Sequence, residues 1–378
     1  LELRPSPGVT IDSDSIRLVA RHQPFVLKAK RDAPGFLRLH IGVNRKSTVN
    51  WSVAFDPLKI VQERPRPADF ESFWRGQAER LEKEVPLDPR CEKDESRSRT
   101  DAVCDWFRVS FATFGGKRVS GLMSVPRGAD AEHKVPGRVR VPGAGVSLYN
   151  RIGLKRAKAA SLCMTVFPFV STLDQNANYK NLLAMNAELK KAFGREYPTA
   201  GICGKVEDQY YFPYVLGINR AANWLWNRDD VDRTRFEYEG GSQGGFFGWM
   251  LCGLNPKFTA AVLRVPAGSD LRAPLAGRHS AWPNPLGFYP DEKRATVVRN
   301  VGYYDGASFA ARIRCPFRLS SGLSDDVCPF ITGIAAFNCT ASDDRRLYAV
   351  PGMRHVYGTP HNDEINAWLN TMGTGPAK

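Results

Sequence analysis

The sequence predicts an α/β fold: a mostly parallel sheet covered by helices on both faces, preceded by a small β-sandwich-like module. Three observations support this. Residues 1–62 contain short alternating apolar runs separated by Pro, Gly and Asn; from Trp106 onward, apolar strand-like runs alternate with helical patterns; and a glycine-rich strand–turn–helix junction lies at 240–245. We therefore expect a β-rich module at 1–62 and a larger α/β domain at 63–378.

The module is predicted from period-two alternation, as in Leu37/Leu39/Ile41 and in the run from Val49 to Phe55, with earlier runs around 16–20 and 25–27. We expect it to pack on the larger domain; sugar binding is the alternative. A Pro-rich break at 64–67 follows. After it, Asp69 precedes a helix with one apolar stripe that includes Phe70 and Trp74.

The larger domain is predicted to alternate strands and helices. Strands are expected at 106–112, 119–125, 138–141, 235–238, 260–265, 317–320 and 347–350, with a further apolar run at 162–169 and helices at 215–225 and 363–372. In such a sheet, a functional site lies at the carboxyl ends of the strands.

The junction reads Gly-Gly-Ser-Gln-Gly-Gly, with Ser242 third. A strand, then Gly-x-Ser-x-Gly, then an apolar helix is the arrangement of a nucleophile elbow, in which a sharp turn holds the serine in a strained conformation. The positive end of the helix favours a reaction that develops negative charge. The alternative is a glycine-rich turn without chemistry.

A serine nucleophile needs a base and an acid. In enzymes with this elbow they follow the serine along the chain, acid first. Among six histidines, His355 and His361 come late enough, and His355, directly after a strand and a Pro-Gly turn, is the better candidate for the base. The acid is predicted in the loop after the strand at 317–320, where Asp325 and Asp326 both remain candidates.

The oxyanion hole is predicted from two backbone N–H groups. One is that of Gln243, directly after the nucleophile. The other comes from the loop after the strand at 138–141, near Ala144, where Gly143 and Gly145 leave room for a carbonyl group. An ordinary tight turn is the alternative for this second loop.

Composition excludes several classes of protein. The chain of 378 residues is 43% hydrophobic and 24% charged, without a disordered tract or an apolar run long enough to cross a membrane. The net charge of +14 comes from scattered basic residues without a nucleic-acid-binding motif, so we expect a solvated basic surface and no nucleic-acid partner.

The eight cysteines show no metal-ligand spacing, and most lie in apolar runs typical of buried thiols. Cys91 and Cys104 flank a polar segment and are the one pair that we predict as a disulfide. We expect neither a metal nor a cofactor.

From about Arg66 to the end, the chain resembles the family of acetyl xylan esterases and cephalosporin C deacetylases, which are α/β-hydrolases. The resemblance rests on RPADFESFW (66–74), Val231-Asp232, GSQGG (241–245), Tyr304-Asp305, ARIRCP (311–316) and GLSDDVCP (322–329). It implies Ser242 as nucleophile, Asp325 as acid and His355 as base, with the Gln243 amide in the oxyanion hole. The choice between Asp325 and Asp326 is resolved by this resemblance alone.

The chain departs from the family pattern in three places. Pro142-Gly143-Ala144 replaces the usual His-Gly-Tyr, Arg354 replaces a glycine before the histidine, and Phe330 replaces the second proline of Cys-Pro-Pro. A backbone oxyanion donor survives the first change, but a pocket wall made by the tyrosine does not. The leading β module is absent from the small cytoplasmic members, which favours a secreted or periplasmic protein.

We therefore expect a serine carboxylesterase that removes acetyl or other small acyl groups from a saccharide or polysaccharide through an acyl-enzyme. One alternative is a peptidase, amidase or larger-acyl esterase of the same fold, since the pocket can be open where the tyrosine is missing. The other is a carbohydrate-binding protein with a degenerate hydrolase domain. The oligomeric state does not follow from the sequence.

Overall fold

The computed structural model describes residues 32–43, 47–145, 158–168 and 175–372, with backbone only for 38–43, 47–50 and 175–178. Its strands form two sheets. β1 (Gly35–Val43) and β2 (Ser47–Phe55) pair as an antiparallel hairpin, in register from Gly35 opposite Phe55 to Val43 opposite Ser47. This hairpin confirms two of the runs predicted for the N-terminal module; the earlier runs lie outside the described residues.

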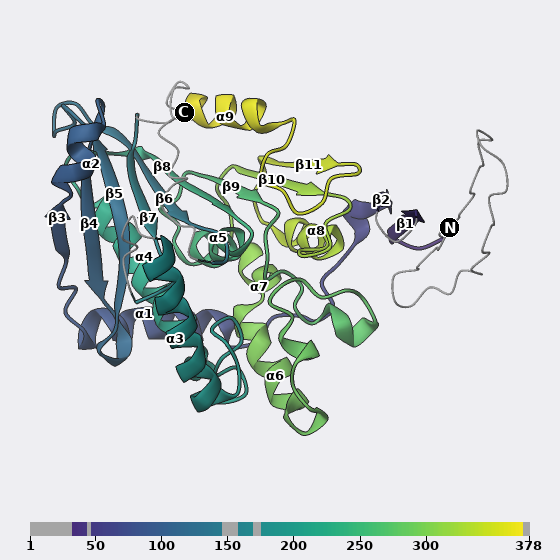
Figure 1. Ribbon diagram of the computed structural model, residues 1–378. Coiled ribbons are helices and arrows are strands. Elements are labelled where there is room, and N and C mark those ends of the chain that lie inside the picture. Colours follow the sequence, from purple (N-terminus) through teal and green to yellow (C-terminus); the bar gives the residue numbers. More distant parts are fainter. Residues whose placement is uncertain (1–31, 44–46, 146–157, 169–174, 373–378) are drawn as a thin grey trace.

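The second sheet has nine strands in the order β11-β10-β9-β8-β6-β7-β5-β4-β3 (Figure 1). The strands from β7 and β6 through β11 run parallel, whereas β3, β4 and β5 form an antiparallel edge that joins β7. The prediction of a mostly parallel sheet is confirmed. The strands are β3 (Arg90–Lys93), β4 (Cys104–Ala112), β5 (Arg118–Pro126), β6 (Val135–Val141), β7 (Ala160–Met164), β8 (Val231–Gly241), β9 (Ala260–Arg264), β10 (Phe317–Gly322) and β11 (Arg345–Val350).

Helices lie on both faces of this sheet, as β9 illustrates. Its residues alternate: Ala261 and Leu263 belong to the main core, while Ala260 and Val262 pack with the C-terminal helix α9. Figure 1 shows α9 on one side of the sheet and α4, α5 and α8 on the other. The helices are α1 (Phe70–Glu84), α2 (Glu95–Thr100), α3 (Gln175–Phe193), α4 (Phe212–Trp226), α5 (Gln243–Leu254), α6 (Asp291–Tyr304), α7 (Gly306–Ala310), α8 (Phe330–Cys339) and α9 (Asn362–Thr371).

α1 begins after Asp69, as predicted, and buries Phe70, Trp74 and Leu81 from one face. Trp74 also donates a hydrogen bond from Nε1 to the carbonyl oxygen of Tyr303, 2.9 Å away. The helix that follows the Pro-rich break is therefore part of the main core. Among the described residues, no helix is long and apolar enough to cross a membrane.

The predicted Cys91–Cys104 disulfide is wrong. Cys91 lies on β3 and pairs across the strands with Val109, well along β4 from Cys104, which starts that strand. Both residues remain thiols. The short, charged and exposed strand β3 was not predicted, because its side chains show no apolar alternation.

Candidate active site

Ser242 lies between β8 and α5, at the carboxyl edge of the sheet. Its backbone has φ 52° and ψ −119°, a region that residues with a side chain rarely occupy. The Ser242 N–H donates to the carbonyl oxygen of Arg264 at 2.9 Å, and its own carbonyl accepts from the N–H groups of Phe246 and Ala267. These bonds to β9, to α5 and to the loop after β9 hold the strained turn.

The glycines around Ser242 are required by close packing. A Cβ on Gly244 would overlap the carbonyl oxygen of Val141, at the end of β6, and a Cβ on Gly241 would overlap the ring of Tyr357. α5 is buried on all sides, from Gln243 to Gly253. The turn can therefore approach its neighbours closely only because these positions have no side chain.

Asp325 lies in the loop after β10 and is fully buried. Its Oδ1 accepts backbone N–H groups of Val327 at 2.9 Å and Cys328 at 2.8 Å. Its Oδ2 lies 2.8 Å from His355 Nδ1. Asp326 instead points outward and forms an exposed ion pair with Arg354. The two neighbouring carboxylates thus have opposite environments.

His355 follows β11 and lies between Asp325 and Ser242. Its Nε2 is 3.0 Å from Ser242 Oγ, and its side chain is 18% exposed. With Nδ1 donating to the Asp325 carboxylate, Nε2 faces the Ser242 hydroxyl as the acceptor of this pair. His361 lies elsewhere, directly before α9, with its ring 5.0 Å from that of Tyr348.

Gln243 links the turn at Ser242 to the loop after β6. Its Oε1 accepts a hydrogen bond from Tyr211 Oη at 2.9 Å, and its Nε2 lies 3.4 Å from the carbonyl oxygen of Gly143. Burial, and then the neighbouring Tyr197, raise the pKa of Tyr211 well above its usual value, so its hydroxyl remains a donor. Ala144, next in this loop, is exposed.

The comparisons with known proteins agree with this architecture. Residues 53–372 match the model of the acetyl xylan esterase family. The chain belongs to that family. The resemblance seen in the sequence is confirmed, and the protein is a carboxylic ester hydrolase of the carbohydrate acetyl esterase type.

Individual relatives of this acetyl xylan esterase family member are distant in sequence. An acetyl esterase, Axe7A, from Xylanibacter ruminicola is 29% identical over 342 residues, which cover 89% of this chain and 74% of that protein. An acetyl xylan esterase from Paenibacillus sp. R4 is similar in structure, with a TM-score of 0.68 at 22% identity, covering 84% of this chain and 98% of that one. Acetyl xylan esterase 1 from Thermoanaerobacterium sp. JW/SL YS485 gives 0.67 at 18% identity, with the same coverages. The α/β-hydrolase fold is therefore confirmed.

Tyr357 was missed by the sequence analysis of this esterase. Its ring covers Gly241 beside the serine, and its hydroxyl lies where a Cβ on Gly143 would be. It comes from the loop that carries His355, and the two ring centroids are 6.2 Å apart. An aromatic ring therefore contacts the loop after β6, where a tyrosine is usual in the family, but it comes from another part of the chain. The sequence carries no direct signal for this contact, because Gly143 is interpreted there as leaving room for a carbonyl group.

Cys328 is a second side chain beside Ser242 whose position the sequence did not predict. It is buried, and burial, followed by the charge of Asp325, raises the pKa of its thiol well above the usual value, although its hydrogen bond with Ser242 lowers it. A raised pKa keeps this thiol in its protonated, weakly nucleophilic form. In the part of the chain that the structure describes, no three His, Cys, Asp or Glu side chains gather as a metal site.

Proposed function

We propose that this esterase removes acetyl groups from a carbohydrate through an acyl-enzyme, with Ser242 as nucleophile, His355 as base and Asp325 as the acid that orients it. The observation that supports this most is the continuous series of contacts from carboxylate to imidazole to hydroxyl, 2.8 Å and then 3.0 Å long. These are hydrogen-bond distances suited to proton transfer. The strained backbone of the serine further supports its role as nucleophile.

In the first half of the reaction, Ser242 Oγ attacks the ester carbonyl while His355 Nε2 takes the hydroxyl proton. The carbonyl oxygen becomes an oxyanion, for which we propose the backbone N–H groups of Gln243 and Ala144 as donors. When the intermediate collapses, the imidazolium gives its proton to the departing sugar oxygen, and the acetyl group stays on Ser242.

In the second half, His355 takes a proton from water as the water oxygen attacks the acetyl carbonyl. Collapse of this second intermediate releases acetate and returns the proton to Ser242 Oγ. The Asp325 carboxylate, through its contact with Nδ1, stabilises the imidazolium in both halves. The atoms and protons of these two half-reactions balance without any metal or cofactor.

For the substrate, we propose acetylated xylan or a similar polysaccharide, supported by the family to which the chain belongs. We propose a secreted or periplasmic location, because a polymer of this kind is met outside the cytoplasm. We also keep the division into a β-rich module at 1–62 and a catalytic domain at 63–378 as a proposal.

The test is release of acetate from acetylated xylan, with p-nitrophenyl acetate as a small reference ester. The wild type should hydrolyse both, and Ser242→Ala should lose at least about 10⁴-fold in kcat/KM for both while keeping its thermal unfolding temperature. A fluorophosphonate should label the wild type and not the variant. Unchanged turnover by Ser242→Ala would exclude the mechanism.

The same assay separates the alternatives. Faster hydrolysis of feruloyl esters than of acetyl esters would indicate a larger acyl group, and cleavage of peptide anilides would indicate an amidase. Binding of xylan without labelling by the fluorophosphonate would indicate a degenerate hydrolase.

A further inference from the structure

The β1–β2 hairpin lies beside the ends of β10 and β11, where the loops bearing Asp325 and His355 begin (Figure 1). We name these the acid loop (residues 323–329) and the base loop (residues 351–358). Ser52, in β2, is 2% exposed, and its Oγ lies 3.3 Å from Ser324 Oγ. Ser324 directly precedes Asp325, so this buried hydrogen bond joins positions 272 apart in sequence next to the proposed acid.

The residue before Ser52 contacts the base loop. The ring of Trp51 lies 3.0 Å from the position that a Cβ on Gly352 would occupy. The two loops are also bonded to each other, because the Ser324 N–H donates to the carbonyl oxygen of Met353 at 2.9 Å. Ser324 therefore joins the base loop through its backbone and the hairpin through its side chain.

The hairpin is also held by contacts outside these two loops. The ring of Phe36 packs on Phe330 of α8, with centroids 5.1 Å apart. After the hairpin, Asn338 Nδ2 donates to the carbonyl oxygens of Pro57 at 2.9 Å and Ile60 at 2.8 Å. Ser52 is thus attached to a fixed support, as positioning of another residue requires.

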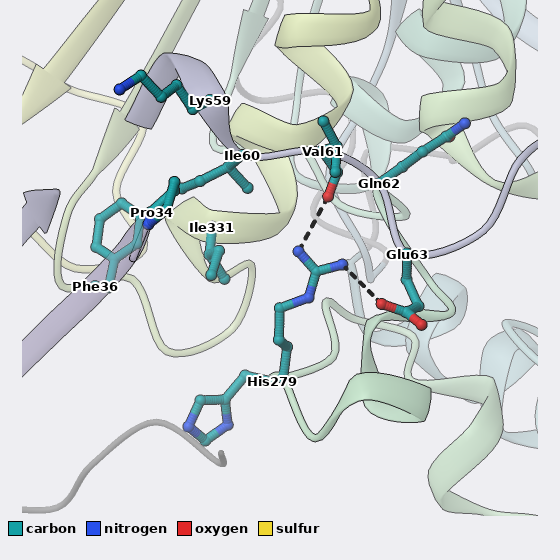
Figure 2. A pocket seen from close by; sticks show the side chains of 10 residues that line it. Pro34, Phe36, Lys59, Ile60, Val61, Gln62, Glu63, His279 and Ile331 are labelled. Carbon is teal, nitrogen blue, oxygen red and sulfur yellow. Dashed lines mark hydrogen bonds and ion pairs between the residues drawn. The ribbon is translucent and has the colours of Figure 1, made fainter. Parts of the chain in front are cut away.

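Arg278 adds a further attachment next to a pocket of about 370 Å³ (Figure 2). Its Nη1 donates to the carbonyl oxygen of Val61 at 3.1 Å, and its Nη2 lies 3.6 Å from Glu63 Oε2. Figure 2 draws these two contacts as dashed lines that end at Val61 and Glu63, in the segment that leaves the hairpin. The hairpin is therefore anchored at both its start and its exit.

We propose that Ser52 is a positioning residue for the proposed reaction: through Ser324 it holds the acid loop so that Asp325 meets His355. This inference rests on the proposed function. The family model matches residues 53–372, and Ser52 lies just before this range. The proposed positioning residue is therefore outside the part of the chain that matches the family. Small displacements of a catalytic group are costly, because proton transfer requires hydrogen-bond distance and alignment.

The test uses Ser52→Ala and Ser324→Ala in the full chain, alone and together, with p-nitrophenyl acetate. Each single change should lower kcat about five-fold with KM nearly unchanged, as expected for the loss of one neutral hydrogen bond. Adding Ser52→Ala to Ser324→Ala should cause little further loss, because the bond through which Ser52 acts is already gone. The rate of fluorophosphonate labelling should fall by the same factor as kcat.

Two control variants separate positioning from stability. Val53→Ala changes the next residue of β2, which is 48% exposed, and should leave kcat unchanged. Ser308→Ala removes a buried hydroxyl that donates to the carbonyl oxygen of Gly302 at 3.0 Å, and should lower the unfolding temperature without lowering kcat.

If Ser52→Ala behaves as Ser308→Ala does, with lower stability and full kcat, the positioning role is wrong. The positioning role is also wrong if the fold-losses in kcat of the two single variants multiply in the double variant. These results leave the proposed function intact, because that function is decided by Ser242→Ala and not by any variant of the hairpin.

Discussion

The turn at Ser242 and the loops that bring Asp325 and His355 to it are built in different ways. The turn is a contiguous stretch whose strained backbone is held by bonds to β9, to α5 and to the loop after β9. The loops meet through contacts between distant positions: 113 apart for His355 and Ser242, and 272 apart for Ser52 and Ser324. The proposed nucleophile thus lies in one contiguous turn, whereas the proposed acid and base are brought to it by loops from distant parts of the chain.

Space for an added side chain also varies between these regions. A Cβ would overlap backbone atoms at Gly244 in the turn, and a Cβ on Gly352 in the base loop would lie 3.0 Å from Trp51, whereas a Cβ on Gly358 at the end of that loop meets nothing within 4 Å. The turn is therefore intolerant of added volume, while the end of the base loop has room for it. Substitutions that add volume in the turn and substitutions that remove hydrogen bonds near the loops test this difference.

The largest effect is expected in the acid loop. Asp325→Asn should lower kcat by about 10⁴-fold, because an amide no longer stabilises the imidazolium or fixes its tautomer. Asp326→Asn is the matched control: its carboxylate is exposed and pairs with Arg354, so kcat should change less than about two-fold. Equal losses in both variants, measured with p-nitrophenyl acetate, would contradict the assignment of Asp325.

A large loss of stability is expected in the turn. Gly244→Ala should lower the free energy of unfolding by about 3 kcal/mol, because the carbonyl of Val141 cannot move away from the new methyl group without disturbing β6. Gly358→Ala should change it by less than about 0.5 kcal/mol. Denaturant unfolding of both variants measures these changes. Equal losses of unfolding free energy would show that the turn tolerates added volume as well as the end of the base loop does.

A smaller effect is expected where the turn meets the loop after β6. Tyr211→Phe removes the donor to Gln243 Oε1 and should lower kcat about five-fold, since the neighbouring N–H is a proposed oxyanion donor. Tyr304→Phe removes a similarly buried hydroxyl that donates to the carbonyl oxygen of Val206. Tyr304→Phe should leave kcat unchanged. A five-fold fall in this control would mean that losing any buried tyrosine hydroxyl lowers kcat, and that the bond from Tyr211 to Gln243 has no particular role.

The last effect concerns the pH dependence of stability at Asp270, whose Oδ1 accepts the Glu63 N–H at 2.8 Å. Burial, and then the charge of Asp305, raise the pKa of Asp270 to about 7. A carboxyl whose pKa is raised by folding stabilises the fold below about pH 4, and this contribution is lost as pH rises through about 7. The free energy of unfolding should fall by about 1–3 kcal/mol across that range.

Asp270→Asn should remove most of this fall, because the amide does not titrate and can still accept the Glu63 N–H. Asp56→Asn changes an exposed carboxylate and should keep the wild-type slope. Unfolding temperatures from pH 4 to 8 test this, and an unchanged slope in Asp270→Asn would show that another group is responsible.

Much of the fold could be predicted from the sequence because its elements have strong local patterns. The continuous apolar run in β9 and the apolar stripe on α1 each indicate a segment that must be buried, and both strand and helix were found at the expected residues. Ser242 was singled out for the same reason, since a turn of this kind needs glycines beside it. The roles of Ser242, Asp325 and His355 remain predictions until the variants are measured.

Other features depend on contacts that no local pattern encodes. Residues alone left Asp325 and Asp326 as equal candidates, and it is the opposite direction of their side chains that separates them. The Cys91–Cys104 pairing failed because strand register, and not closeness in sequence, decides which residues face each other. Tyr357 could not be foreseen, because it reaches the turn from another loop.

The sequence by itself determined the α/β architecture, the family and the strained serine turn, because periodic burial and glycine placement act over a few neighbouring residues. Only the tertiary structure decided that Tyr357 covers Gly241 and that the β1–β2 hairpin contacts the acid loop. Those outcomes depend on the meeting of distant segments, whose geometry is fixed by packing across the whole sheet.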